Sequence, residues 1–356
     1  MEKRAKVIVA MSGGVDSSVA AALLARKYEV IGAHITKLDL PGLPPELASR
    51  DKESLASARR SAGIIGIPLR TIEAGRSFDA LVDSFCAEYN AGRTPNPCVI
   101  CNVQIKWRAL LELASEEGAG LVATGHYARV EERDGAFHLS RSKAAGKDQT
   151  YFLHRLTQAE LSRTVFPLAE MTKTEVKALA RELGLPAAER AESQEICFVG
   201  EGGYREVLGA RTAGAIRSGE VVDAAGRQVG RHEGYQFYTI GQRKGLGIAL
   251  GRPAYVVGID AKTARVTLGS AEEITAKGLR AGDVNWVVPP AAERAFEAAV
   301  KIRYAHAGAR SLVTPEGTGA RVEFQEAVRA VTPGQAAVFY VGDEVVGGGW
   351  ITAAEH

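Results

Sequence analysis

The sequence predicts an α/β protein with an N-terminal doubly wound parallel sheet, a small mainly-β central domain and a C-terminal β-barrel. In the first half, short β-branched runs alternate with helical patterns, which is typical of a parallel sheet covered by helices on both faces. After about Gly200, glycines become frequent and short strands replace the helical patterns. The length of 356 residues allows two or three domains, and we place them at 1–200, 201–272 and 273–356.

The first elements follow one another as strand, glycine turn and helix. Residues 7–10 form a β-branched run that predicts a buried strand, and the alanine- and leucine-rich residues 19–27 predict a helix. The same alternation is expected further along, with strands at 30–35, 68–72 and 121–124 and helices at 54–61 and 110–117. The three prolines of residues 39–51 predict a surface loop.

The second half consists of short strands separated by turn residues. They are expected at 255–259, 265–268, 299–304, 320–324 and 336–341. Residues 201–270 carry 10 Lys and Arg against 6 Asp and Glu, and this local excess of four positive charges favours contact with a polyanion. The net charge of the whole chain is only +2, which neither predicts nor excludes a nucleic-acid partner.

Composition restricts the class of protein. With 46% hydrophobic and 24% charged residues, neither disorder nor a fibrous repeat is expected. The apolar runs are far shorter than the roughly 18 residues of a membrane span, and no signal-peptide pattern is present, so we expect a soluble, cytoplasmic protein without membrane contact. Four cysteines in such a chain indicate metal, redox or catalytic chemistry rather than a disulfide framework.

The turn Ser-Gly-Gly-Val-Asp-Ser-Ser at 12–18 predicts a phosphate-binding site. Adjacent glycines let the backbone approach an anion, and Ser17 and Ser18 add hydroxyls at the positive end of the following helix. No lysine follows the glycines, so the turn is not a Walker-type loop, and the spacing does not fit a dinucleotide fingerprint. Asp16 fits a Mg²⁺-binding role beside the phosphates. The alternative is an N-capped turn with no ligand.

The cysteines allow several chemistries. Cys98 and Cys101 lie in an irregular, proline-containing loop, and such a pair is compatible with zinc, a redox couple or an iron–sulfur cluster. Zinc is disfavoured because the sequence has no second Cys-x-x-Cys pair and no matched histidine pair. Cys197, between Ile196 and Phe198, is either reactive or a buried apolar side chain.

Together these motifs resemble the tRNA-uridine 2-sulfurtransferases, the MnmA/TrmU family of the PP-loop ATP pyrophosphatase superfamily. The resemblance runs nearly end to end, through the blocks AMSGGVDSSVAA, GRTPNPCVICN, TGHYAR, KDQTYFL, SQEICFVGE, YTIGQRKGLGI, KIRYAH and VTPGQAAVFY. It implies an adenine-nucleotide hydrolase-like first domain and ATP-dependent 2-thiolation of the wobble uridine, position 34, in the anticodon stem-loop of tRNA. ATP would adenylate the C2 oxygen, and a sulfur nucleophile would then displace AMP.

The resemblance also implies roles for individual residues. ATP, with Mg²⁺, would be bound by Ala10, Met11, Ser12, Gly13, Gly14, Val15, Asp16, Ser17, Ile35 and Gly125. The tRNA would be contacted by His126, Lys147, Asp148, Gln149, Arg303, Tyr304 and Gln335. Ser57 stands where the family commonly has an aspartate.

Two sulfur chemistries follow from the resemblance. A persulfide on Cys197, supplied by a sulfur-donor or persulfide-carrier protein, would be resolved by Cys101 and leave a disulfide. Alternatively, Cys98, Cys101 and Cys197 would hold a [4Fe-4S] cluster with one open iron, and we place this alternative first. Many members carry an acid–base aspartate at the position of Cys98, and a thiol cannot replace it directly. Cys86 belongs to neither scheme and is expected to be buried in a helix.

Two other functions compete with this one. Another ATP pyrophosphatase, of the ligase or amidotransferase type, would share the phosphate turn but would not need Cys101 or Cys197. A non-catalytic RNA-binding protein would bind ATP without turnover. Structural roles also compete with the tRNA contacts: a core position for His126, a solvated turn for Lys147 and Asp148, a strand pair for Arg303 and Tyr304, and a turn for Gln335.

Overall fold

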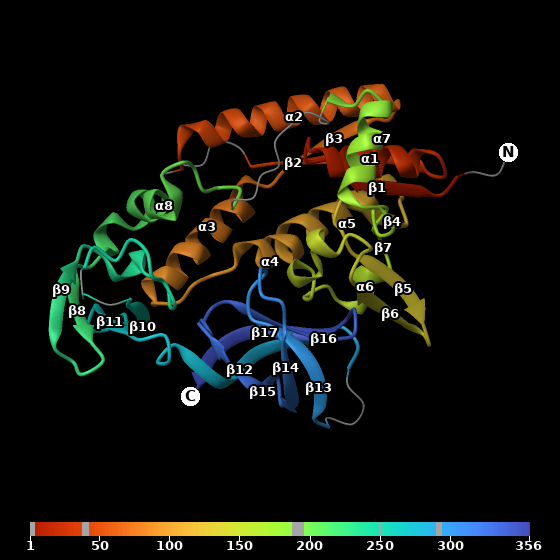
Figure 1. Cartoon of the computed structure of the whole chain (residues 1–356). Helices are drawn as coiled ribbons and strands as arrows, with labels where there is room; N and C mark the ends of the chain where they lie inside the picture. The colour runs from red at the N-terminus through yellow and green to blue at the C-terminus, as the bar shows by residue number, and fades with distance from the viewer. Residues whose placement is uncertain (1–3, 38–42, 187–195, 249–250, 252, 290–293) are drawn as a thin grey trace. The chain divides into compact units, whose positions relative to one another are not determined.

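The structure is a computed structural model that describes residues 4–37, 43–186, 196–248, 251, 253–289 and 294–356 (Figure 1). The chain forms two compact units. The first contains Met1–Leu81, Cys98–Glu201 and Asp343–Val345, and the second contains Val82–Pro97, Gly202–Gly342 and Val346–His356.

A five-stranded sheet in the order β3-β2-β1-β4-β7 is the centre of the first unit. Its strands are β1 (Lys6–Ala10), β2 (Glu29–Thr36), β3 (Leu69–Glu73), β4 (Leu121–Ala123) and β7 (Thr164–Val165). All four pairings between neighbours are parallel, and β1 is fully buried over Val7, Ile8 and Val9. The predicted parallel sheet is therefore confirmed.

Helices cover both faces of this sheet, as Figure 1 shows for α2 and α5. The helices that begin in the first unit are α1 (Val15–Ala25), α2 (Pro45–Ile65), α3 (Gly75–Asn90), α5 (Arg108–Glu117), α6 (Gln158–Leu161) and α7 (Lys173–Glu182). Val7 and Val9 pack against α1 and α2, while α5 contacts β1. Because side chains of a strand alternate between faces, Ile8 faces the opposite side from Val7 and Val9.

The cysteine segment is helical, so the predicted irregular loop around Cys98 and Cys101 is wrong. It comprises α4 (Pro97–Cys101) and a π-helix, η1 (Asn102–Trp107), which runs on into α5. Two strands that the sequence did not predict, β5 (Arg129–Arg133) and β6 (Ala136–Ser140), form a hairpin in the first unit. The 3₁₀ turns η2 (Ala145–Lys147) and η3 (Thr150–Phe152) follow it.

The predicted surface loop over residues 39–51 is wrong in its second part. Helix α2 begins at Pro45, with Pro44 as its N-cap, and already includes residues 45–51. Proline suits the first turn of a helix because that turn needs no amide donor. Residues 38–42 lie outside the described residues.

The second unit contains two sheets. The four-stranded sheet has the order β10-β11-β8-β9. Its strands are β8 (Gly219–Asp223), β9 (Gln228–His232), β10 (Tyr255–Asp260) and β11 (Arg265–Gly269). Helix α8 (Gly203–Thr212), the 3₁₀ turn η5 (Ala213–Ala215) and the 3₁₀ turn η6 (Tyr235–Phe237) accompany them. The central domain is mainly β as predicted, although α8 was not expected.

The C-terminal strands form a closed six-stranded barrel in the order β12-β15-β14-β13-β16-β17, with β12 paired to β17. They are β12 (Thr275–Trp286), β13 (Phe296–Lys301), β14 (Ala309–Glu316), β15 (Gly319–Arg329), β16 (Ala336–Val341) and β17 (Glu344–Glu355). Val300, Val313, Val322 and Phe339 lie in its core. The predicted barrel, and with it the predicted fold class, is confirmed.

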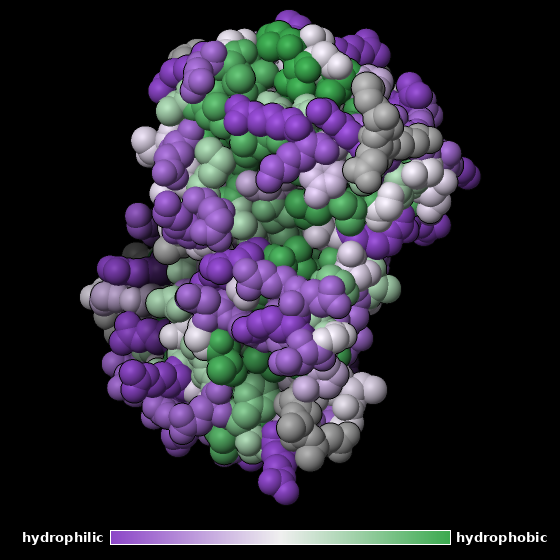
Figure 2. Space-filling model, turned by 90° about the vertical axis from the view of Figure 1, so that its right-hand side faces the viewer, coloured by the Kyte–Doolittle hydropathy of each residue, from purple (hydrophilic) through white to green (hydrophobic). Residues whose placement is uncertain are grey.

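The hydropathy of the surface and the length of the helices are the two features to compare with those of a membrane protein. On the face drawn in Figure 2, hydrophilic side chains are interspersed with hydrophobic ones. Within the part of the chain that the structure describes, no helix combines the length and the apolar composition that a membrane span requires.

Candidate active site

The turn between β1 and α1 is closely packed. Gly13 has φ +78°, and a Cβ there would lie 2.2 Å from the carbonyl oxygen of Ser54 in α2. A Cβ on Gly125, just after β4, would lie 2.7 Å from the backbone of Asp16 and Ser17. Both positions therefore require glycine, because any larger residue would push the turn away from its neighbours.

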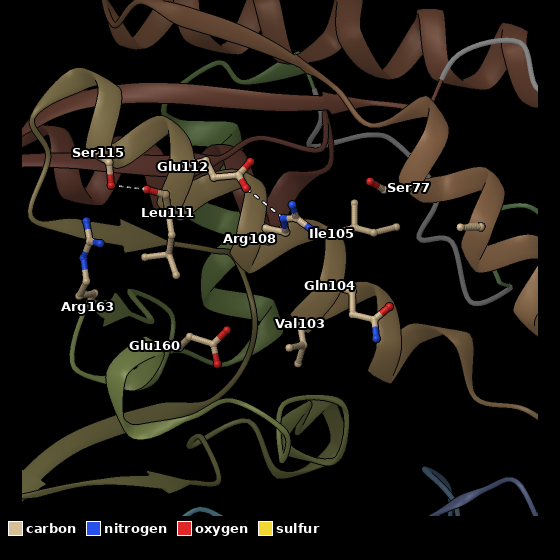
Figure 3. Close-up of a pocket in the computed structure, with 11 residues that line it drawn as sticks. Ser77, Val103, Gln104, Ile105, Arg108, Leu111, Glu112, Ser115, Glu160 and Arg163 are labelled. Atoms are coloured by element: carbon tan, nitrogen blue, oxygen red, sulfur yellow. Dashed lines mark hydrogen bonds and ion pairs between the residues drawn. The ribbon is translucent and has the colours of Figure 1, made fainter.

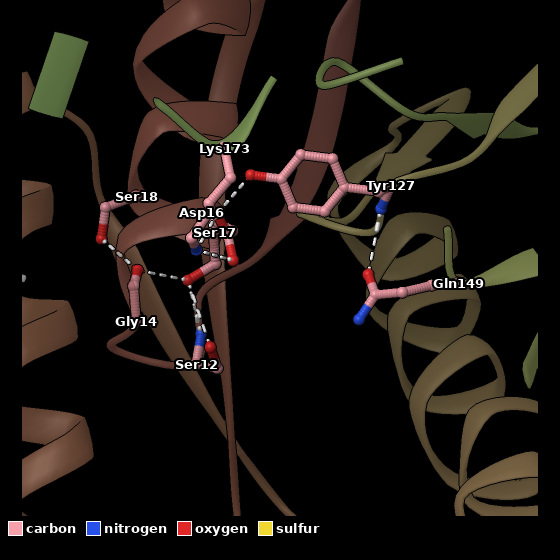
Figure 4. Close-up of polar contacts among 8 residues, drawn as sticks. All are labelled: Ser12, Gly14, Asp16, Ser17, Ser18, Tyr127, Gln149 and Lys173. Carbon is pink, nitrogen blue, oxygen red and sulfur yellow. Dashed lines mark hydrogen bonds and ion pairs between the residues drawn. The ribbon is translucent and has the colours of Figure 1, made fainter. Parts of the chain in front are cut away.

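Hydroxyl groups fix the same turn (Figure 4). Ser17 Oγ donates to Gly14 O at 3.0 Å and accepts from the backbone N–H of Ser12 at 3.2 Å. Ser18 Oγ also donates to Gly14 O, and Ser57 Oγ donates to Gly13 O at 2.9 Å. The hydroxyl of Ser57 in α2 thus supports the turn.

The N-terminus of α1 lacks a side-chain cap. Its N-cap residue is Gly14, which has no side chain and so makes no side-chain hydrogen bond to the first amide groups of the helix. The first amide groups of a helix have no partner within the helix, so they face outward as anion donors. This arrangement fits the phosphates of ATP.

Asp16 lies in the first turn of α1 and is held by two other residues (Figure 4). Lys173 Nζ lies 2.7 Å from Asp16 Oδ1 and 2.8 Å from Oδ2, and the hydroxyl of Tyr127 donates to Oδ1 at 2.8 Å. Sequence reasoning missed Lys173, which is 157 residues from Asp16. A carboxylate beside a phosphate cradle still fits Mg²⁺, which is commonly held by one carboxylate and substrate phosphates.

The remaining residues predicted for ATP line the ends of neighbouring strands. Ala10 ends β1, Met11 is buried, and Ile35 lies near the end of β2 in register with Ile72 of β3. Gly125 follows β4. Since β2, β1 and β4 are adjacent and parallel, their carboxyl ends share one edge of the sheet, where α/β proteins bind ligands.

Three cysteines gather in the first unit, and their burial differs. Cys101 is buried, Cys98 is half-buried and Cys197 is exposed. Each of Cys98 and Cys101 has Cys197 among the groups that influence its pKa, so the thiols lie near one another. Burial raises the pKa of Cys98 to about 11 and also raises the pKa of Cys101. The interpretation of Cys197 as a buried apolar residue is wrong, because its neighbour Phe198 occupies the core instead.

Lys37, which no motif indicated, contacts this thiol cluster. It follows β2, and its side chain forms a hydrogen bond with Cys197 and lies 5.5 Å from the centre of the Phe78 ring. Burial lowers the pKa of Lys37, but the charges of Cys197, Asp51 and Cys101 outweigh burial and raise it. The ammonium group therefore stays charged beside the sulfur atoms.

The π-helix η1 brings a second lysine to the same cluster. Lys106 Nζ donates to Asn102 Oδ1 at 2.8 Å, and its charge lowers the pKa of both Cys98 and Cys101 against the effect of burial. A π-helix is rare and often marks a functional site. No sequence pattern predicted a π-helix in this segment.

The predicted iron–sulfur ligands do not form a metal site as they are placed. Across the described ranges, no group of three or more His, Cys, Asp or Glu side chains is arranged to hold a metal ion. Cys98, Cys101 and Cys197 are free thiols. Cys86 is buried in α3, as expected, and burial raises its pKa to about 11.

The residues predicted for the target base have structural partners. His126 Nδ1 lies 2.7 Å from Thr124 Oγ1, and burial lowers the pKa of His126 to about 3, so the ring is neutral. Asp148 is buried and accepts from Thr150 Oγ1 at 2.8 Å. Its interpretation as part of a solvated turn is therefore wrong.

The two neighbours of Asp148 differ in their environment. Gln149 Oε1 accepts from the backbone N–H of Tyr127 at 3.0 Å (Figure 4). Lys147 ends the 3₁₀ turn η2 and is half-buried. Gln149 thus links the predicted base-contacting loop to the residue that holds Asp16.

The residues of the second unit also have defined surroundings. Gln335 Nε2 donates to the carbonyl oxygens of Thr94 at 3.1 Å and Pro95 at 3.0 Å, in the segment that precedes the cysteines. Arg303 and Tyr304 lie in a turn after β13 rather than in a strand. Tyr304 is 39% exposed, which suits stacking on a base.

A groove of about 830 Å³ lies elsewhere in the first unit (Figure 3). It is lined by α3, η1, α5 and α6, and Arg108 Nε donates to Glu112 Oε1 there at 2.9 Å. None of the residues predicted for ATP, sulfur or tRNA lines it.

A glycine turn that leads from the carboxyl end of a parallel strand into a helix N-terminus is the arrangement of a nucleotide-binding α/β domain. Models of three families match in sequence order: the tRNA methyl transferase HUP domain over residues 5–201, the tRNA methyl transferase PRC-barrel domain over 208–270 and the aminomethyltransferase beta-barrel domain over 276–351.

Curated relatives align over almost the whole chain. The tRNA-specific 2-thiouridylase MnmA of Geobacter metallireducens is 51% identical, covering 99% of this chain and 98% of the relative. The protein of the same name from Geotalea uraniireducens is 46% identical, with 99% and 96% covered. Among solved structures, NMN synthetase from Francisella tularensis aligns with 54% of this chain and 67% of its own at 16% identity and a TM-score of 0.33.

The chain therefore belongs to the tRNA-specific 2-thiouridylase (MnmA) family, and it is a sulfurtransferase acting on tRNA uridine. The resemblance predicted from the sequence blocks is confirmed. The competing assignments, another type of ATP pyrophosphatase and a non-catalytic RNA-binding protein, are thereby set aside.

Proposed function

We propose that this enzyme acts in the cytoplasm and 2-thiolates the wobble uridine, position 34, of tRNA through an adenylated C2 oxygen, with sulfur delivered by Cys197 and Cys101. One observation carries the proposal. The phosphate turn follows β1, Lys37 follows β2, and Gly125 and His126 follow β4. These three adjacent strands therefore direct the groups proposed for ATP, and the lysine that contacts the thiols, to one edge of the sheet.

The phosphate turn supports the first step. The α1 amides and the hydroxyls of Ser12 and Ser17 would bind the phosphates of ATP, and Asp16 would hold Mg²⁺, which would neutralise phosphate charge. The C2 oxygen of the uracil attacks the α-phosphorus, an O–P bond forms, and pyrophosphate leaves. The carbonyl oxygen thereby becomes part of a leaving group, AMP.

The difference in burial between the two cysteines supports their roles. Exposed Cys197 can accept sulfur from a donor protein as a persulfide, whereas buried Cys101 cannot reach such a partner. The terminal sulfur of the persulfide attacks C2 and AMP leaves. The Cys101 thiolate then attacks the Cys197 sulfur, the S–S bond to the product breaks, and a Cys101–Cys197 disulfide forms that an external thiol must reduce.

A [4Fe-4S] cluster on Cys98, Cys101 and Cys197 is the competing sulfur chemistry. Such a cluster would supply an open iron as the binding site for sulfide. The two chemistries differ in their use of Cys98, because the persulfide route needs only Cys101 and Cys197.

Five of the seven tRNA contacts in the proposal fall into two groups. Arg303 and Tyr304 are exposed and can meet RNA directly, by charge and by stacking. Asp148, Gln149 and Gln335 are engaged with the protein and would act by shaping the loops that contact the anticodon stem-loop.

The test is thiolation of unmodified tRNA by anaerobically purified protein with ATP and a persulfide donor, followed on an organomercury gel. We expect Cys101→Ala and Cys197→Ala each to abolish thiolation while ATP binding is retained. The matched control is Cys86→Ala, which removes a thiol outside the cluster and should keep activity.

Cys98→Ala distinguishes the two sulfur chemistries in the same assay. Retained thiolation by colourless protein supports the persulfide route. Brown, iron-rich wild-type protein that loses both iron and activity in Cys98→Ala supports the cluster. Full thiolation by Cys101→Ala or Cys197→Ala would refute both the persulfide route and the cluster.

A further inference from the structure

Lys173 occupies a position that its own helix does not favour. It is the first residue of α7, directly after the N-cap Thr172, whose hydroxyl accepts from the backbone N–H of Glu175 in a capping box. A helix N-terminus carries partial positive charge, so an ammonium group there is repelled rather than stabilised. Lys173 therefore needs an anion from outside α7, and Asp16 provides it at 2.7 Å.

The same ion pair lies at the phosphate cradle. Asp16 is in the first turn of α1, whose amide groups have no side-chain cap at Gly14 and fit phosphate. An unpaired carboxylate at this position would repel an incoming triphosphate, and Lys173 neutralises it. The side chain of Asp16 is 31% exposed and that of Lys173 is 13% exposed, so the pair borders the surface on the carboxylate side.

Tyr127 holds Asp16 independently of the lysine. Its hydroxyl donates to Asp16 Oδ1 at 2.8 Å, its side chain is buried, and its backbone N–H is fixed by Gln149. Asp16 therefore stays in place when the ammonium group moves. A long lysine side chain can shift by rotamer changes, whereas the buried tyrosine ring cannot.

We propose that Lys173 is a nucleotide-binding residue: its ammonium group pairs with Asp16 in the free enzyme and transfers to the phosphate oxygens of ATP when nucleotide binds, leaving the Asp16 carboxylate to Mg²⁺. The proposal rests on the proposed use of ATP. The competing role is a structural tether between α1 and α7, which already pack through Val15, Val19, Val176 and Ala180.

Equilibrium binding of ATP to the full-length protein, measured by calorimetry with and without Mg²⁺, separates the two roles. We expect Lys173→Met to weaken ATP binding about ten- to a hundredfold, as loss of a charge-assisted hydrogen bond does. Asp16→Asn should bind Mg²⁺-free ATP as tightly as wild type or more tightly, because it releases Lys173 and removes a negative charge. Lys173→Arg should recover part of the affinity.

The control is Lys27→Met, which removes the same charge beyond the other end of α1, where the side chain is exposed. It should leave ATP affinity unchanged. Thermal unfolding of each variant confirms that it folds. Equal ATP affinity of Lys173→Met and wild type would overturn the role of Lys173 while the proposed thiolation stands, and a wild-type protein that binds no ATP would overturn both.

Discussion

The phosphate turn and the thiol cluster are built in different ways. The turn is contiguous, since residues 12–18 provide its glycines, hydroxyls and carboxylate. The thiol cluster combines Lys37, the segment from Cys98 to Lys106, and Cys197, which come from three distant parts of the chain. A contiguous site depends on local backbone geometry, whereas a distributed site depends on how the strands and helices pack.

The largest expected effect tests the contiguous site. Gly13→Ala places a methyl group against the Ser54 carbonyl and should abolish ATP binding, with an unfolding free energy lowered by about 1–3 kcal/mol more than in the control. The control is Gly66→Ala, at the same φ of +78° but with nothing within 4 Å of the added carbon. Denaturant unfolding and ATP binding of the two variants are the measurements.

Equal losses in the two variants would mean that only backbone strain matters at Gly13. The close packing of the turn against α2 would then have no role in nucleotide binding.

A smaller effect is expected in the distributed site. Lys37→Met removes the charged hydrogen-bond donor of Cys197 and should slow thiolation about ten- to a hundredfold, with ATP affinity unchanged. Lys37→Arg should keep more activity, and Lys52→Met, an exposed lysine of α2, should be silent. Single-turnover thiolation measures the rate, and a parallel loss of ATP affinity would show that the two sites are not separable.

The smallest expected effect is a difference in pH dependence between the two sites. Burial raises the pKa of Cys101, so below that pKa its thiolate fraction rises about tenfold for each pH unit. Single-turnover thiolation should therefore rise by up to about tenfold between pH 7 and pH 8 when resolution by Cys101 limits the rate. ATP affinity, measured over the same range, should change far less.

A thiolation rate that is flat with pH would assign the limiting step to adenylation. Alkylation of Cys98 adds a second check, because burial raises the pKa of this thiol to about 11 and should make it much less reactive at pH 8 than at pH 10.

Local patterns predicted much of the fold. The β-branched run at 7–10 and the barrel strand at 336–341 appear as β1 and β16 because each pattern matches the period of a buried strand. The loop prediction at 39–51 failed at Pro45, because proline marks the start of a helix as readily as a loop.

The sequence by itself determined the glycine turn at 12–18, the doubly wound sheet, the barrel and the family, because glycine placement, residue periodicity and ordered motifs are local properties of the chain. Only the tertiary structure decided that Lys173 pairs with Asp16, that Lys37 meets Cys197, and that Cys197 is exposed while Cys101 is buried. These contacts join residues far apart in the chain, and their geometry follows from the packing of strand ends and helices, which no short pattern encodes.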